Sequence, residues 1–188
     1  LVRSAVQSKF TSIYETLRTI ARMPGIRASS AQVHDLGEND RIPIKELYRN
    51  LSKHVQVSEI YIVHKEFNPD RRDPSTGRPE VPSMMFDDEI ALEEEKVGKD
   101  VEDDKETGVE SFEYHQIREQ MDRMSRLLDT ETPDSGLVYP FIASREVITC
   151  DERNFNRDEP DDNARKGIIL SVPFYDERGR FRGVVSAI

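Results

Sequence analysis

The last 22 residues, 167–188, form the sequence pattern that most restricts the fold. They read GIILSVPFYDERGRFRGVVSAI, two apolar segments on either side of a short polar stretch. Asp176 and Gly179 suit a tight turn, because Asp caps backbone donors and Gly adopts positive φ without strain. Gly183 permits the close approach of a neighbouring strand. The pattern therefore predicts a closing antiparallel hairpin and, with it, an antiparallel sheet.

Three segments have the apolar spacing of amphipathic helices. Residues 1–23 form the longest, which ends before Pro24 and Gly25. Asp40 suits the N-cap of a second helix over residues 42–54. A third is expected from about residue 110, with its methionines in the core. The inward positions are Val2, Val6, Phe10, Ile13, Leu17 and Ile20; Ile44, Leu47, Tyr48 and Leu51; and Tyr114, Ile117, Met121, Met124 and Leu128.

Two further segments are predicted to be strands. One includes the β-branched and aromatic residues Val57, Ile60, Tyr61, Ile62 and Val63. The other, residues 137–150, reads as one strand or as two broken near Pro140 or Ser144. The element order predicts an α+β fold with the helices gathered on one side of an antiparallel sheet. The length suits a single domain over residues 1–188.

Acidic residues are concentrated in one segment. The chain carries 37 Asp and Glu against 27 Lys and Arg, a net charge of −10. Residues 87–110 hold 12 of these acids and 3 lysines, so that segment alone carries −9. We expect it to be exposed and mobile beside a nearly neutral domain. The acidic balance also argues against a nucleic-acid partner.

Motifs of common catalytic and cofactor sites are absent. The sequence contains no HExxH, no GxSxG and no glycine-rich nucleotide loop. Cys150 is the only cysteine, which excludes an internal disulfide and a multi-cysteine zinc site. The four histidines are expected at surface or edge positions. The acids of residues 151–162 leave a hard-cation site open, although they lack EF-hand order. We therefore expect this segment to be no enzyme and to need no cofactor.

No apolar run is long enough to span a membrane. The first residues nevertheless read as the middle of a helix and the last as an unfinished strand. We therefore expect flanking segments on both sides, which could include transmembrane helices.

Several stretches, in this order and spacing, resemble the Cache sensor domains, the PAS-like extracytoplasmic domains of bacterial receptors. They are the first helix ending in ARMPGIRA, the stretch LYRNLSKHVQVSEIYIVHKEF and, most specifically, SVPFYDERGRFRGVVSAI. The resemblance implies a long N-terminal helix packed on a PAS-like antiparallel sheet. It implies a periplasmic, extracytoplasmic domain of an inner-membrane receptor, with a small-molecule ligand bound between the sheet and its covering loops. Binding would shift the terminal helices and regulate a histidine kinase, cyclase or chemotaxis module.

Five residues are candidates for the ligand pocket: Tyr139, Arg145, Thr149, Asp151 and Tyr175. Strand alternation predicts that Arg145, Thr149 and Asp151 share one face. The guanidinium of Arg145 could clamp a carboxylate, and Asp151 could accept a hydrogen bond from an amine or hydroxyl. Tyr175 precedes the hairpin turn and could close the pocket. Surface charge and core packing are the alternative roles for these side chains.

Two functions stay open on the sequence alone. One is the ligand-binding sensor domain. The other is a ligand-free PAS-like module for dimerisation or interaction, in which the first helix forms a homodimer seam. His115 and Arg118, on the third helix, are weaker ligand candidates.

Overall fold

In the computed structural model, the described residues are 2–29, 38–72, 80–82, 84–86, 106–128, 137–149 and 166–188. The helices are α1 (Val2–Ala21), α2 (Pro24–Ala28), α3 (Glu38–His54) and α5 (Glu106–Leu127). The strands are β1 (Ile60–His64), β2 (Met84–Phe86), β3 (Ile142–Ile148), β4 (Lys166–Tyr175) and β5 (Phe181–Ala187). They form one antiparallel sheet in the order β2-β1-β5-β4-β3. The predicted α+β class is confirmed.

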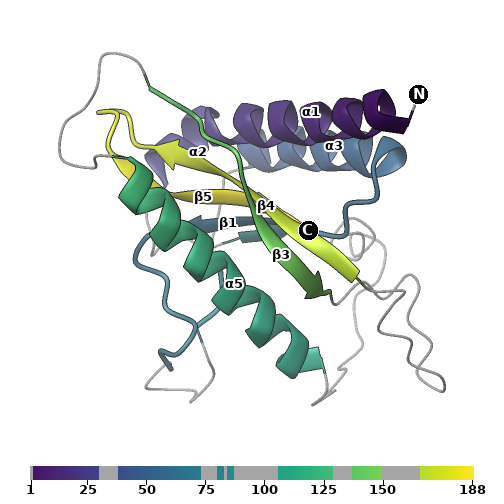
Figure 1. Ribbon diagram of the computed structural model, residues 1–188. Helices are drawn as coiled ribbons and strands as arrows, with labels where there is room; N and C mark the ends of the chain where they lie inside the picture. The colour runs from purple at the N-terminus through teal and green to yellow at the C-terminus, as the bar shows by residue number, and fades with distance from the viewer. Residues whose placement is uncertain are drawn as a thin grey trace.

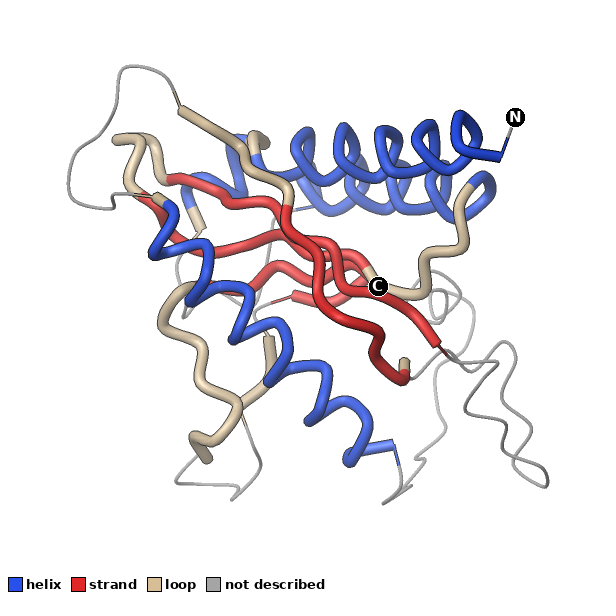
Figure 2. The backbone as a smooth tube through the Cα atoms, viewed as in Figure 1, coloured by secondary structure: helices blue, strands red, loops and turns tan. Residues whose placement is uncertain are grey.

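Helices cover both faces of the sheet (Figures 1 and 2). α1 and α3 lie side by side on one face, and α5 crosses the other face diagonally. The expectation that all helices lie on one side is therefore wrong. The physical reason is that β4 and β5 are apolar on both faces, so each face needs a cover.

The first face is covered by α1, α2 and α3. α1 ends at Ala21, and Pro24 opens the short α2, since proline suits the first position of a helix. The predicted inward stripe of α1 is buried only in the second half of the helix. Residues 3–12, in the first half, are exposed. The core of this face includes Ile13, Leu17 and Ile20 of α1, Ile44 and Leu51 of α3, and Ile62, Val172 and Val185 of the sheet.

The second face is covered by α5, whose predicted inward residues are all buried. Met121 and Met124 pack in the core as expected. The helix begins at Glu106 rather than near residue 110, so the last five residues of the acidic segment are helical. Residues 87–105, where mobility was predicted, lie outside the described residues.

The closing hairpin is confirmed as strands β4 and β5 joined by the predicted turn. Gly179 has φ 78°, and the Asp176 carboxylate accepts hydrogen bonds from the backbone N–H groups of Arg178 and Arg180, both at 2.9 Å. Burial alone would raise the pKa of Asp176, but hydrogen bonds from Arg180 and Arg178 lower it. The turn is therefore fixed by the two residues that predicted it.

Three local features differ from the sequence predictions. α3 begins at Glu38, so Asp40 is not its N-cap; the Asp40 carboxylate instead accepts from the N–H of Gly25 at 3.3 Å and joins α3 to α2. β2 was not predicted, because a three-residue strand leaves no periodic signal. β3 carries a bulge at Ser144 and Arg145, which both stand opposite Ile169.

Candidate functional site

A hydrogen-bonded polar cluster lies between the sheet and α5. Ser171 of β4 and Ser186 of β5 stand opposite each other, with their hydroxyl oxygens 2.7 Å apart. The Ser171 hydroxyl also donates to the side-chain carbonyl of Gln120 on α5. The Gln120 amide in turn donates to the backbone carbonyl of Ile169 at 2.8 Å. Gln120 is only 2% exposed and both serines are fully buried, so this chain of bonds is inside the protein.

A second polar group lies on the same face of the sheet, around Tyr61 of β1. The Tyr61 hydroxyl donates to the Glu59 carboxylate and lies 3.4 Å from a carboxylate oxygen of Glu113 on α5. All three side chains are buried. The ring of Tyr61 also packs edge-on against Tyr114. Carboxylate, phenol, amide and hydroxyl groups are thus gathered beneath one helix.

Such a cluster is not needed to attach a helix to a sheet. Burying a hydroxyl or amide costs about 1–3 kcal/mol unless a hydrogen bond compensates, and compensation leaves little net gain. Apolar side chains of similar size would hold α5 at least as well. Departures of this kind from an apolar core are expected at functional sites.

The structure brings two of the predicted ligand residues together. The rings of Tyr139 and Tyr175 meet edge-on, with centroids 5.4 Å apart. The Tyr175 hydroxyl donates to the backbone carbonyl of Val138. Burial raises the pKa of Tyr175 above its ordinary value, and Tyr139 adds to this effect. Tyr175 belongs to the core on the α5 side, whereas Tyr139 packs against the cores of both faces.

The other three predicted residues are in different surroundings. Thr149 is buried beside Gly167 of β4. Arg145 is exposed at the bulge, although Val147 and Thr149, which alternation would place on its face, are buried. The bulge interrupts the alternation of side chains along the strand at this point. Arg145 is therefore exposed while Thr149 is buried. Asp151 lies outside the described residues, as does the possible cation site at 151–162.

The two weaker candidates attach α5 to the segment after β1. The guanidinium of Arg118 donates to the backbone carbonyls of Lys65 and Phe67, at 2.8 and 2.6 Å. His115 lies 3.0 Å from the carboxylate of Asp70. Both side chains therefore hold the helix in place over the sheet.

His64 is a buried polar residue on the opposite face, at the end of β1. It is 0% exposed, so its expected surface position is wrong. Its Nε2 lies 3.2 Å from the hydroxyl of Ser29, which itself donates to Ile26. No described residue bonds its Nδ1. Burial lowers the pKa of His64 to about 4; Glu66 opposes this shift and Arg182 adds to it.

Sequence reasoning did not identify Gln120, Ser171 or Ser186. A usable signal was present, since each serine interrupts an otherwise apolar strand on the same face. Gln120 likewise lies on the inward arc of α5 between Ile117 and Met124. These interruptions predict a polar site only once the register aligns the two strands, and the sequence does not reveal that register directly.

Comparison with known protein-family models, curated proteins and solved structures gives no match. Within the described ranges, no helix has the length and apolar character needed to cross a membrane. The same residues contain no group of three or more His, Cys, Asp or Glu side chains arranged to hold a metal ion.

Proposed function

We propose that this chain is the small-molecule sensor domain of a bacterial membrane receptor, of the PAS-like Cache type, without enzymatic activity of its own. The buried polar cluster of Gln120, Ser171 and Ser186 is the observation that carries the proposal. It places hydrogen-bond donors and acceptors among apolar side chains, which is one of the features of a small-molecule site. The sheet order β2-β1-β5-β4-β3 is compatible with a PAS-like fold.

The ligand in this proposal binds between the sheet and α5. A polar molecule there would exchange the Gln120–Ser171 hydrogen bond for bonds to itself and displace α5. The two nearby buried carboxylates favour a ligand that donates hydrogen bonds. Such a ligand would be small, because α5 is already packed on the sheet.

The central strands offer a route from this site to the long helix. Ser171 and Ser186 face α5, and their neighbours Val172 and Val185 face α1. A shift of β4 or β5 on one face therefore moves the packing surface of α1 on the other. A rigid helix transmits such a shift along its length, which is how the proposed receptor would pass its signal to a cytoplasmic module.

Substitution of Gln120 by Leu tests the site. A screen of small polar metabolites by thermal shift is expected to identify a stabilising compound, which at 100 times its Kd adds about 2.7 kcal/mol. Gln120→Leu and Ser171→Ala should each reduce this stabilisation strongly, since each removes a group that would bind the ligand. Gln116→Leu, one turn earlier on α5, is the matched control and should keep the full response. An identified ligand whose effect is unchanged in both site variants would contradict the proposal.

The membrane tether is tested separately. Hydrophobic spans directly before residue 1 and after residue 188 in the full-length protein would support a receptor. An uninterrupted water-soluble chain would contradict it.

A second function, a dimerisation module built on α1, is favoured by one observation. Val6 and Phe10 are 47% and 37% exposed on the first half of α1. They border an apolar hollow of about 220 Å³, whose walls include Val57, Ile168 and Ile188. An exposed stripe of this kind suits pairing with the same stripe of a second copy.

Phe10→Glu tests the dimer. The charge is expected to weaken self-association by about tenfold or more, since a buried carboxylate without a partner is costly. Sedimentation velocity over a range of protein concentrations measures the effect. Ser12→Glu adds the same charge on a different side of α1 and should leave association unchanged. A chain that stays monomeric at the highest concentration, or equal weakening by both variants, would contradict this dimer.

A further inference from the structure

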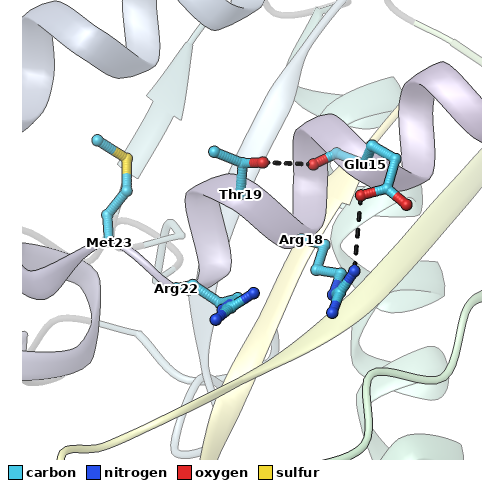
Figure 3. Close-up of a pocket in the computed structure, with 5 residues that line it drawn as sticks. All are labelled: Glu15, Arg18, Thr19, Arg22 and Met23. Atoms are coloured by element: carbon cyan, nitrogen blue, oxygen red, sulfur yellow. Dashed lines mark hydrogen bonds and ion pairs between the residues drawn. The ribbon is translucent and has the colours of Figure 1, made fainter.

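An open hollow with two arginines in its lining lies against the last two turns of α1, on the side of the sheet away from Gln120. It has a volume of about 330 Å³ and is lined by Glu15, Arg18, Thr19, Arg22 and Met23. Figure 3 shows the guanidinium groups of Arg18 and Arg22 extending from the same side of the helix. A cavity of this size is at the lower end of the range for small-molecule sites.

Arg18 is held in a fixed orientation with unused hydrogen-bonding capacity. Its guanidinium carbon lies 5.6 Å from the centre of the Tyr139 ring, in a cation–π arrangement. Its Nη1 is 3.6 Å from the Glu15 carboxylate, which is an ion pair but too long for a good hydrogen bond. Its Nε is buried and bonds to no residue in the described part of the chain.

Arg22 adds a second positive charge four residues further along the chain, in the turn that follows the end of α1 at Ala21. Two like charges that border the same small space repel each other. Arg22 is exposed, and no side chain in the described part of the chain forms an ion pair with it. An anion between the two guanidiniums would relieve this repulsion and accept hydrogen bonds from both, and it would take the place of the Glu15 carboxylate beside Arg18.

We propose that this cavity binds a small oxyanion, a phosphate or carboxylate group, through Arg18 and Arg22. The planar guanidinium fork matches the paired oxygens of either group. The Tyr139 ring fixes Arg18 before binding, so little side-chain entropy is lost. The Thr19 and Met23 side chains complete the walls. This site is separate from the one beneath α5 and does not depend on it.

Arg22→Gln is the decisive variant, because an exposed residue can be changed without loss of folding. Calorimetric titration with sodium phosphate and with sodium succinate, at ionic strength matched by sodium chloride, is expected to show saturable binding of at least one anion. Loss of one charge-assisted contact should weaken that binding by about tenfold or more. Arg22→Lys should retain part of the affinity, since it keeps the charge but not the fork. The anion that binds identifies the group recognised.

Arg3→Gln removes a charge from the same helix outside the cavity and should leave binding unchanged. Equal loss in Arg3→Gln and Arg22→Gln would indicate only general attraction to a basic helix and would overturn the proposal. So would the absence of saturation by both anions, or unchanged affinity in Arg22→Gln. A purely structural role for Arg22 at the end of α1 would lower the melting temperature of the variant without changing anion affinity. Gln120→Leu, which tests the other site, should not affect this titration.

Discussion

Gly183→Ala is expected to lower the free energy of unfolding by about 3 kcal/mol or more. Gly183 of β5 stands between His64 of β1 and Phe174 of β4. A Cβ atom there would lie 2.1 Å from the carbonyl oxygen of Val63 and 2.9 Å from the Cα of His64. Both atoms belong to the backbone of a paired strand, so the sheet itself would have to deform. Urea denaturation followed by circular dichroism measures the loss.

Gly167→Ala is the matched control for this prediction. Gly167 lies in the adjacent strand β4, and its added Cβ would meet the Cγ2 of Thr149 at 2.7 Å. A side-chain methyl can shift more easily than backbone, so the loss should be clearly smaller. Equal stability losses in the two variants would show that close backbone approach at Gly183 is not the determining factor.

Acidification from pH 7 to pH 4 is expected to remove about 3 kcal/mol of stability through His64 alone. The pKa of His64 falls to about 4 in the folded protein from an ordinary value of 6.5, chiefly because of burial. Below pH 6.5 the unfolded chain therefore binds a proton that the folded chain does not. The part of the free energy of unfolding that depends on neutral His64 is complete above pH 6.5. It is lost progressively as the pH falls toward 4.

The measurement compares the pH dependence of stability in the native chain and in His64→Gln. Titrating carboxylates act in both proteins, so the difference between the two curves isolates His64. The free energy of unfolding of the native chain minus that of His64→Gln should shrink, or change sign, as the pH falls from 7 to 4. His54→Gln, an exposed position in the last turn of α3, should follow the native curve. Parallel curves for the native chain and His64→Gln would contradict the prediction.

The sequence predicted the elements whose pattern extends over many residues. The apolar spacing of α5 and the two strands of the closing hairpin are long, regular signals, and the inward residues predicted for the helix are all buried. The first half of α1 extends beyond the sheet, so Val6 and Phe10 are exposed while Ile13 and Leu17 are buried. The apolar spacing of the helix is the same in both halves and could not predict this difference. Periodicity describes which side of a helix is apolar, and the partner decides how much of that side is covered.

Less of the candidate site was predictable. Tyr139 and Tyr175 were selected from different segments, and they do lie in contact. Arg145 was placed by strand alternation, and a bulge at Ser144 and Arg145 disrupts that alternation. The sequence left open a break near Ser144, but it did not show that one continuous strand would carry a bulge there. Ser171 and Ser186 become a pair only through the register of β4 and β5. Long-range pairing of this kind depends on the complete sheet, whereas single-sequence reasoning works on one segment at a time.

The outer strand β3 has a consequence for how copies of this protein can associate. An open strand edge can recruit a strand from another molecule and start aggregation. β3 exposes Arg145 and Glu146, and its bulge interrupts the straight row of backbone donors and acceptors that an added strand would need. Glu146 also forms an ion pair with Lys166 of β4 at 3.2 Å. This edge therefore resists the addition of a strand from a second molecule.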